Sequence, residues 1–375
     1  MSARFLTVVL ERAFNMRDGF GREIDYMRIS VIDSCNLNCY YCNPCDNNEH
    51  CHALNILSVK EVLCIVRAAT RLGIKHFRLT GGEPLLHPQL DEMVLQIKKI
   101  PGVSSVSLTT NAVLLAQHAK QLKEAGIDSI NVSLDTIDAS EYERITKKPL
   151  LEEVKHGINA AIECGIRVKI NVVLTPQTDV VALTRYVAKK GTDIRFIEMM
   201  PVGEGHTNGV EPYKKVIGTL SKLYGEPCRI NTEKTKEINS GNDKRKIPDN
   251  GPAEYYIFPE LGIRVGLIQA IHGKFCATCN RIRVTADGRL MPCLGSSVTM
   301  DLVPDSWDFA DDVEKDFAIV RALRAAIKAK PRCHNFNDNA VTYTKTTETK
   351  NTETKTTELK AAEVNAARNM SRIGG

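Results

Sequence analysis

Three cysteines in one short segment are the residues of this sequence best suited to chemistry. Cys35, Cys39 and Cys42 lie within eight positions of one another in CNLNCYYC, directly after the apolar stretch RISVID. Thiolates hold iron–sulfur clusters, and a four-iron cubane with three thiolate ligands leaves one iron able to bind a substrate or cofactor. Zinc is the alternative, but a closed structural zinc site needs four ligands and would have to recruit His50 or Cys51 across a loop.

A second group of three cysteines lies in FCATCNRIRVTADGRLMPCL. Cys276, Cys279 and Cys293 have C-x2-C-x13-C spacing, whereas a zinc ribbon would need a second C-x-x-C pair. Arg281 and Arg283 alternate between these cysteines, so on a short strand their side chains would share one face. Because guanidinium groups suit phosphate, the pair predicts an anionic ligand close to the cysteines.

The composition sets limits on the kind of protein. The chain has 375 residues, 12 cysteines and a formal net charge of +5, an excess too small for a nucleic-acid-binding surface. No run of eighteen apolar residues predicts a membrane span, and MSARFLTVVLERAF lacks the apolar core of a signal peptide. We therefore expect a soluble cytoplasmic protein, in which clustered cysteines serve metals rather than disulfides. The isolated Cys64 and Cys164 fall in helical patterns and are expected to be buried and inert.

Alternating strands and helices are the elements that must position the cysteines. β-Branched runs predict six strands, YMRISVID, KHFRLT, SSVSLTT, SINVSLD, RVKINVVL and DIRFIEMM. Helical patterns between them predict helices near residues 58–72, 88–99, 113–125, 150–164 and 179–190. Ser58 with Glu61 forms a capping box. Helix ends are expected at Gly73, Gly126, Gly165 and Gly191. This succession predicts parallel strands buried on both faces, in a partial TIM-like barrel or a doubly wound sheet.

Polar residues gather where the predicted strands end, which favours the barrel, because the carboxyl rim of a barrel is where ligands bind. Helix N-termini also point their amides toward that rim. The residues concerned are Cys35 to Cys42, GGEP at 81–84, Thr110 with Asn111, SLD at 133–135, Lys169 with Asn171, and Glu198 to Met200.

The first cysteine segment resembles the CxxxCxxC motif of the radical S-adenosylmethionine enzymes, and GGEP resembles their methionine-binding segment. The resemblance implies a partial (β/α)6 TIM-like barrel, the radical SAM core, in which the three cysteines hold a [4Fe–4S] cluster. Its open iron would chelate S-adenosyl-L-methionine, and one electron would cleave the sulfonium to a 5′-deoxyadenosyl radical. The positions that would line this cofactor are Tyr41, Gly82, Ser133 and Met200.

Similarity to the GTP 3′,8-cyclases, the MoaA family of molybdenum cofactor biosynthesis, extends over roughly residues 20–336 and the closing MSRIGG. It is carried by YMRISVIDSCNLNCYYC, LGIKHFRLTGGEPLL, INVSLDTID, FIEMMPVGEG and FCATCNRIRVTADGRLMPCL. The resemblance implies that Cys276, Cys279 and Cys293 hold a second [4Fe–4S] cluster facing the guanine of GTP. The nucleotide-contacting positions would be Arg28, Arg78, Thr109, Lys169, Arg281, Ile282 and Arg283, with catalytic roles for Arg281, Arg283, Gly374 and Gly375.

The activity that the resemblance implies is conversion of GTP to (8S)-3′,8-cyclo-7,8-dihydroguanosine 5′-triphosphate. Abstraction of the ribose 3′ hydrogen would precede attack on C8 of the purine. The implied partners are GTP as substrate, an electron donor, the cyclic pyranopterin monophosphate synthase that takes the product, and a second copy in a homodimer, with no nucleic acid or membrane. The alternatives are another radical SAM enzyme with an auxiliary cluster, such as a peptide-modifying maturase, and a non-enzymatic iron or zinc sensor that binds nucleic acid. The sequence lacks the helix-turn-helix pattern and the clustered surface charge that such a sensor would need.

The expected domains are an N-terminal extension at 1–27, the partial barrel at 28–234, the region with the second cluster and GTP contacts at 235–336, a low-complexity linker at 337–369 and the Gly-Gly tail at 370–375. The Thr, Lys and Glu repeat at 341–360 has too few apolar residues to build a core and predicts a linker. Other departures from the family pattern are Ser34 in place of arginine, Asn43 in place of methionine, and the group Cys45, His50, Cys51 and His52, which we interpret as a polar loop.

Overall fold

One twelve-stranded sheet organises the part of the chain that the computed structural model describes, which comprises residues 16–42, 55–202, 205, 209–230, 251–296, 298–302, 312–334 and 336. The strand order is β12-β11-β10-β1-β2-β3-β4-β5-β6-β9-β8-β7. The six strands predicted from the sequence are confirmed, and they pair in chain order, all parallel. They are β1 (Tyr26–Ser30), β2 (His76–Thr80), β3 (Ser105–Thr110), β4 (Ser129–Ser133), β5 (Val168–Leu174) and β6 (Asp193–Glu198).

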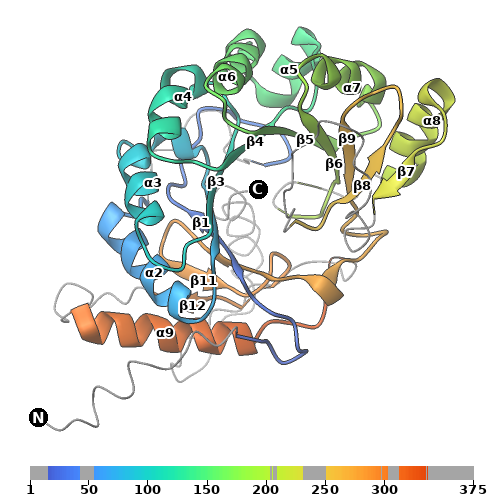
Figure 1. Ribbon diagram of the computed structural model, residues 1–375. Helices are drawn as coiled ribbons and strands as arrows, with labels where there is room; N and C mark the ends of the chain where they lie inside the picture. The colour runs from blue at the N-terminus through green and yellow to red at the C-terminus, as the bar shows by residue number, and fades with distance from the viewer. Residues whose placement is uncertain are drawn as a thin grey trace, which may run out of the picture.

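Helices surround the outer side of these strands (Figure 1). The five predicted helices are confirmed as α2 (Val59–Arg71), α3 (Leu90–Lys98), α4 (Leu115–Glu124), α6 (Leu151–Glu163) and α7 (Val180–Lys189). The capping box of Ser58 and Glu61 is present at the start of α2. The four glycines expected at helix ends all have left-handed φ angles, which only glycine adopts at little cost. A short helix that the sequence did not predict, α5 (Ala139–Thr146), begins at an Asp138 cap.

The C-terminal region adds a parallel strand to each edge of the six-stranded core. β9 (Arg264–Ile268) pairs with β6, and β10 (Arg281–Val284) pairs with β1, so the parallel part has eight strands rather than the expected six. Antiparallel strands continue the sheet beyond both. On the β9 side these are β8 (Glu254–Ile257) and β7 (Cys228–Ile230), and on the β10 side β11 (Arg289–Met291) and β12 (Met300–Asp301). Because β12 and β7 are separate edges of the order, the barrel of the described residues is partial, as expected.

The remaining described helices lie beside these additions. A π-helical turn (Tyr213–Ile217) leads into α8 (Gly218–Tyr224), which packs against α7. α9 (Asp312–Lys328) lies along α2 at the outer side of β11 and β12 (Figure 1). Within the described residues, no helix combines the length and apolarity needed to cross a membrane.

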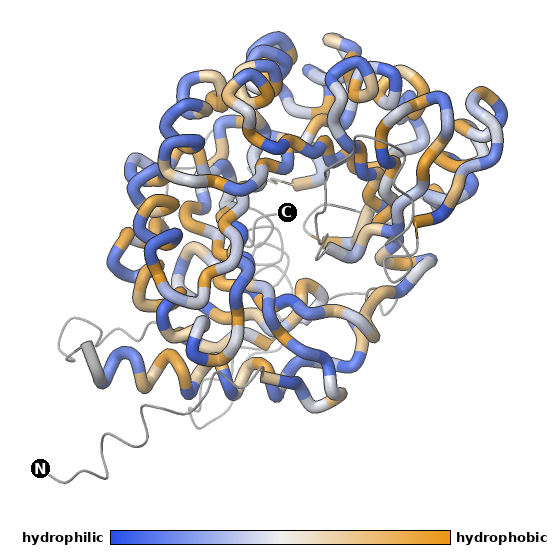
Figure 2. The backbone as a smooth tube through the Cα atoms, in the orientation of Figure 1, coloured by the Kyte–Doolittle hydropathy of each residue, from blue (hydrophilic) through white to orange (hydrophobic). Residues whose placement is uncertain are grey.

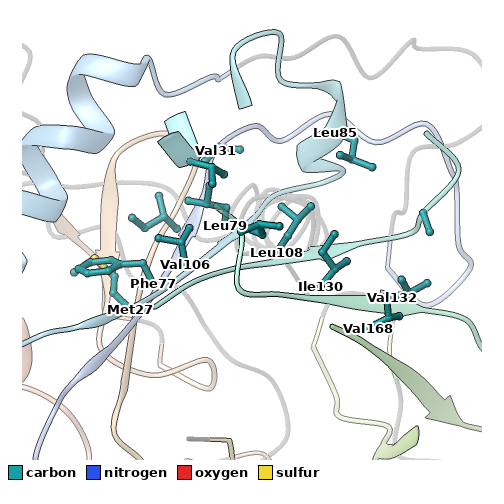
Figure 3. Packing of buried hydrophobic residues seen from close by; sticks show 14 of the residues in the cluster. Met27, Val31, Phe77, Leu79, Leu85, Val106, Leu108, Ile130, Val132 and Val168 are labelled. Atoms are coloured by element: carbon teal, nitrogen blue, oxygen red, sulfur yellow. The ribbon is translucent and has the colours of Figure 1, made fainter. Parts of the chain in front are cut away.

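Apolar side chains on the outer face of the sheet form the core with the helices. Figure 3 shows them as a continuous band from Met27 through Phe77 and Val106 to Ile130 and Val168. The helices alternate between hydrophilic and hydrophobic positions, as amphipathic helices do (Figure 2). The alternate residues of the same strands are polar and line a cavity on the inner face. Several of them, such as Lys169 and Arg195, are nevertheless buried, as expected for strands buried on both faces.

Candidate active site

The polar inner face of the sheet encloses a cavity of about 750 Å³, a volume typical of small-molecule sites. Residues far apart in the sequence meet on its wall. All six predicted cluster ligands line it, namely Cys35, Cys39, Cys42, Cys276, Cys279 and Cys293. The four predicted S-adenosylmethionine positions also line it, namely Tyr41, Gly82, Ser133 and Met200.

The predicted GTP positions divide into two sets. Six of them line the same cavity, namely Arg28, Arg78, Thr109, Lys169, Arg281 and Arg283. Ile282 does not, because its side chain is fully buried in the hydrophobic core on the other face of β10. A contact between Ile282 and a nucleotide would therefore have to use its backbone.

The two groups of cysteines lie at opposite ends of the strands that line the cavity. Cys35 follows the carboxyl end of β1, whereas Cys279 precedes the amino end of β10. β10 runs parallel to β1, with Arg281 opposite Tyr26, so the two cysteines stand at opposite ends of this pair. Cys293 returns to the end that holds Cys279, because β11 runs antiparallel to β10. A ligand in the cavity would therefore lie between two sets of thiols.

The first group of thiols is held in an environment that favours their neutral form when no metal is bound. Burial raises the pKa of Cys35 to about 12, and the nearby Glu83 adds to this shift. Burial also raises the pKa of Cys42 to about 11 and that of Cys39 well above its usual range. A coordinated metal reverses this preference, because it takes up the thiolate and supplies the opposing charge.

The donor set fits an iron–sulfur cubane better than a single ion. Three sulfurs are soft ligands, and each can take a separate iron of a cubane. Within the described ranges, no group of three or more His, Cys, Asp or Glu side chains is arranged to hold one metal ion.

The glycine pair of GGEP allows two loops at the rim to touch. A Cβ added to Gly82 would lie 2.2 Å from the carbonyl oxygen of Ser34, and one added to Gly81 would lie 2.4 Å from that of Ile32. At this close approach the Gly82 amide donates to the Ile32 oxygen at 2.8 Å, and the Glu83 amide donates to the Ser34 oxygen at 2.8 Å. The segment is thus hydrogen-bonded to the residues that lead directly into Cys35, and Ser34 participates through its backbone alone in these contacts.

Glu83 fixes the loops after β2 and β3 from a fully buried position. Its Oε1 accepts from the Leu85 amide at 3.0 Å and the Thr110 hydroxyl at 2.7 Å, and its Oε2 accepts from the Asn111 amide at 2.7 Å. Burial raises the pKa of Glu83 to about 7, against the effect of these hydrogen bonds. Asn111 in turn lies beside the first cysteine, with its Nδ2 3.8 Å from the sulfur of Cys35.

A second buried carboxyl group connects the cysteine loop to β4 and β5. The Tyr41 hydroxyl donates to Asp135 Oδ2 at 2.5 Å, and Oδ1 of the same carboxylate accepts from the Val173 amide at 2.8 Å. Burial raises the pKa of Asp135 to about 6, although both hydrogen bonds oppose the shift. Tyr41 is therefore positioned by a hydrogen bond to a residue after β4, as well as by its neighbours in the loop.

Three arginines stand in one row across neighbouring strands. Arg28 of β1 is in register with Arg78 of β2 on one side and with Arg283 of β10 on the other. Neighbouring strands are about 5 Å apart, and like charges at directly opposed positions destabilise a sheet. The row is therefore unfavourable by itself and suited to an anion that lies across it.

Two arginines of this row have lowered pKa values, as expected for buried cations that lie close to one another. Burial lowers the pKa of Arg28 well below its ordinary value, and Arg283 is the next largest cause. Burial, followed by the charge of Arg281, lowers the pKa of Arg283 to about 10. Among the described residues, Nη1 of Arg283 is buried without a hydrogen-bond partner. A polyanionic ligand would satisfy both the charge and this donor.

Three further cations on the cavity wall, Arg167, Arg195 and Lys330, were missed by the sequence analysis. Arg195 of β6 lies in register with Asn171 of β5, and its Nε donates to the hydroxyl of Tyr255. A signal was available, since Arg195 is an alternate, inward-facing position in a strand whose outward residues are apolar. Lys330, which follows α9, had no comparable signal, because a lysine after a helix is usually a solvated residue.

The second group of thiols differs electrostatically from the first. Burial raises the pKa of the Cys279 thiol, but Arg281 and Lys330 lower it by a larger combined amount, to about 7. Cys279 therefore ionises more readily than an ordinary cysteine before any metal binds, whereas burial raises the pKa of Cys276. Soft sulfur donors near cations again fit a cluster that carries negative thiolate ligands.

Several predicted features lie outside the described residues. These are Asn43, the group Cys45, His50, Cys51 and His52, the repeat at 341–360, and the tail with Gly374 and Gly375.

Comparisons with known proteins agree with this arrangement. The Radical SAM superfamily model matches residues 29–182, and the Molybdenum Cofactor Synthesis C model matches residues 192–336. A GTP 3′,8-cyclase of Clostridium perfringens is 35% identical over 324 residues, which cover 86% of this chain and 95% of the relative. A GTP 3′,8-cyclase of Peptoclostridium acidaminophilum is 37% identical over 328 residues, which cover 86% of this chain and 94% of the relative.

Among solved structures, SuiB of Streptococcus suis has the same fold, with a TM-score of 0.50 at 15% identity over 72% of this chain and 60% of that one. The extended matches to the two cyclases, together with both family models, cover the partial barrel and the segment that bears the second group of cysteines. The chain therefore belongs to the GTP 3′,8-cyclase family of the radical SAM superfamily.

Proposed function

We propose that this protein converts GTP to (8S)-3′,8-cyclo-7,8-dihydroguanosine 5′-triphosphate, the first step of molybdenum cofactor biosynthesis. The observation that carries the proposal is a single cavity with three thiols at each end and a row of three arginines between them. The cofactors are two [4Fe–4S] clusters and S-adenosyl-L-methionine. When bound, they supply one-electron cleavage of the sulfonium and a radical that abstracts hydrogen.

We assign the carboxyl end of the barrel to S-adenosylmethionine. Cys35, Cys39 and Cys42 would ligate the first cluster, since they follow β1 at that end. The GGEP segment lies against the loop leading into these cysteines and leaves its backbone at the cavity wall. Tyr41, held by Asp135, would orient the cofactor from the opposite side. A cavity enclosed by the sheet also limits access of water to a reactive radical.

We assign the middle and the amino end of the barrel to GTP. The triphosphate would lie on the row formed by Arg28, Arg78 and Arg283, which has the charge and the free donor to bind it. The guanine would then point toward Cys276, Cys279 and Cys293, the proposed ligands of the second cluster. Thr109 and Lys169 face the same cavity and would add polar contacts. Catalytic roles for Arg281, Arg283, Gly374 and Gly375 remain predictions.

The remaining assignments are also proposals. A reducing cytoplasm suits iron–sulfur clusters and free cysteines, and an electron donor of that compartment would supply the reduction. The product would pass to a cyclic pyranopterin monophosphate synthase, and the protein would act as a homodimer. The domain limits at 1–27, 28–234, 235–336, 337–369 and 370–375 stay predictions.

Anaerobic reconstitution tests the function. The wild-type chain should bind about eight irons, form more deoxyadenosine when GTP is present, and yield the cyclised nucleotide with S-adenosylmethionine and dithionite under argon. Deoxyadenosine formation without any dependence on GTP would instead favour a peptide-modifying maturase with an auxiliary cluster. Zinc in place of iron, with no cleavage of S-adenosylmethionine, would favour a metal sensor.

A further inference from the structure

Lys330 is a buried lysine to which neither the sequence nor the family comparison assigns a role. Lys330 is only 2% exposed, although it lies two positions after the end of α9. Its Nζ donates to the carbonyl oxygens of Arg281 and Pro292, each at 2.8 Å. Burying an ammonium group is costly unless a counter-charge is close. We therefore expect the groups around Lys330 to include that counter-charge.

The ionisable groups that act on Lys330 most strongly are two thiols and two cations. Burial lowers the pKa of Lys330, the thiols of Cys279 and Cys293 raise it, and the neighbouring Arg22 and Arg281 lower it again. Lys330 lines the cavity together with both cysteines. Its natural counter-charge is therefore the pair of sulfurs, once these are thiolates.

The same lysine also connects the two segments that carry these sulfurs. Arg281 follows Cys279 by two residues, and Pro292 directly precedes Cys293. A single ammonium group thus holds one carbonyl next to each cysteine, on strands that approach each other antiparallel. The two sulfurs are kept near one another by contacts made through Lys330.

Arg22 completes this arrangement for the third cysteine. Its guanidinium donates to the carbonyl oxygens of Cys276 at 2.7 Å, Pro331 at 2.6 Å and Arg332 at 3.1 Å. Asp18 pairs with Arg22 at 2.5 Å, so the charge of Arg22 has a carboxylate partner. Arg22 therefore explains how the segment after α9 is anchored, whereas the charge of Lys330 faces the thiols.

We propose that Lys330 is a positioning residue for the second cluster, which holds the segments of Cys279 and Cys293 together and raises the reduction potential of the cluster by placing a buried positive charge beside its sulfurs. A nearby cation favours the reduced state, because reduction adds negative charge. The inference rests on the cluster ligands of the proposed function and adds to it a residue that tunes the second cluster.

The test separates the charge from the hydrogen bonds. Lys330→Gln keeps an NH donor and removes the charge, Lys330→Met removes both, and Lys330→Arg keeps the charge. Lys328→Met is the matched control, since it removes an exposed lysine two residues away at the end of α9. Each reconstituted protein is titrated potentiometrically under argon and followed by electron paramagnetic resonance. The signal that GTP perturbs reports the second cluster, and the signal that S-adenosylmethionine perturbs serves as an internal reference.

In Lys330→Gln, the reduced-to-oxidised ratio of the second cluster should fall about tenfold at the wild-type midpoint, which corresponds to a shift of about 59 mV for one electron. The first-cluster signal, the Lys330→Arg variant and the Lys328→Met control should stay close to wild type. Selective loss of the second cluster from the Gln and Met variants, with retention in the Arg variant, would also support the role of the charge. The proposal would be overturned by an unchanged second-cluster potential in Lys330→Gln or by an equal shift in Lys328→Met. It would also be overturned if Lys330→Arg lost the second cluster as the Gln variant does.

Iron content distinguishes failure of this inference from failure of the proposed function. A wild-type chain that binds only one cluster would refute the ligands assigned to the second site. A wild-type chain with two clusters and variants of unchanged potential would refute the role of Lys330 alone.

Discussion

Replacing Arg283 by methionine should stabilise the protein without GTP and weaken its binding of GTP. Arg283 is 8% exposed, lies opposite Arg28 on the neighbouring strand, and has a buried Nη1 without a described hydrogen-bond partner. Its pKa is lowered from 12.5 to about 10, which corresponds to an unfavourable free energy of about 3 kcal/mol for the charged form in the folded state. Since this pKa lies below that of the unfolded chain, the cost is present at neutral pH and disappears only as the pH rises past about 10.

Methionine fills similar space and carries no charge, so part of this cost should be recovered. The sulfurs of the second cluster compensate some of the charge, and we expect a gain of about 1–3 kcal/mol in the free energy of unfolding. With GTP the balance reverses, because the loss of one phosphate-binding cation should weaken binding by about 2–5 kcal/mol. Guanosine, which has no phosphates, should bind the variant and the wild type almost equally.

Urea denaturation of the reconstituted protein under argon measures the first effect, and calorimetric titration with GTP and guanosine measures the second. Arg289→Met is the matched control, because Arg289 is 44% exposed on the neighbouring β11 and lies within 3.6 Å of Asp287 and 3.5 Å of Asp301. Loss of such a surface pair should change stability by less than about 1 kcal/mol and leave GTP binding intact. Destabilisation of Arg283→Met without GTP, or equal affinity of variant and wild type for GTP, would refute this reasoning.

Cys39→Ala should abolish deoxyadenosine formation, whereas Cys279→Ala should leave some uncoupled formation and no cyclised product; equal cleavage of S-adenosylmethionine in the two would contradict the ligand assignments. Between about pH 4.5 and 7, Glu83 holds a proton in the folded chain that it has released in the unfolded chain, so the free energy of unfolding falls by about 3 kcal/mol as the pH rises through that window. Glu83→Gln should remove this pH-dependent change. Urea midpoints at pH 5 and 8 check this, and identical pH dependence in variant and wild type would count against it. Deletion of residues 374–375 should spare GTP binding and reduce ring closure, as calorimetry and product analysis would report. Excision of 345–357 should keep turnover within a few fold, since loop closure depends weakly on length, and inactivity with intact clusters would mean that the repeat has another role.

The strands and helices of the core could be predicted because their signals are local. Five helices carry amphipathic patterns of nine or more residues. Most strand residues alternate between apolar and polar positions, although Val172, Val173 and Leu174 of β5 do not. α5 was missed because its eight residues place few apolar side chains, such as Tyr142 and Ile145, against the fold. Strands of two or three residues, such as β11 and β12, are too short for any period to appear.

The site was predictable only in part, for a related physical reason. Motif spacing identified the cysteines, but the environment of their sulfurs comes from contacts between distant segments. Lys330 acts through the carbonyls of Arg281 and Pro292, and any residue can offer a carbonyl. Arg195 could have been predicted, because an arginine is rarely buried without a partner and this one occupies an inward position of a buried strand. Sequence alternation indicates such a residue but does not identify what it faces.

The direction of β10 decides how the two groups of cysteines can cooperate. If β10 ran antiparallel to β1, the residues before it would lie at the carboxyl end of β1, and Cys279 would stand near Cys35. The parallel pairing places them at opposite ends and brings Arg283 into register with Arg28. One strand pairing therefore creates both the cavity bounded by two sets of thiols and the row of cations within it. The pairing joins Tyr26 to Arg281, so no local pattern in the sequence could reveal it. This strand pairing causes both the unfavourable charge of the row and the separation of the two groups of thiols. A ligand with a polyanionic part and a base at one end therefore matches the cavity, because the polyanion would lie on the arginines and the base would reach one group of thiols.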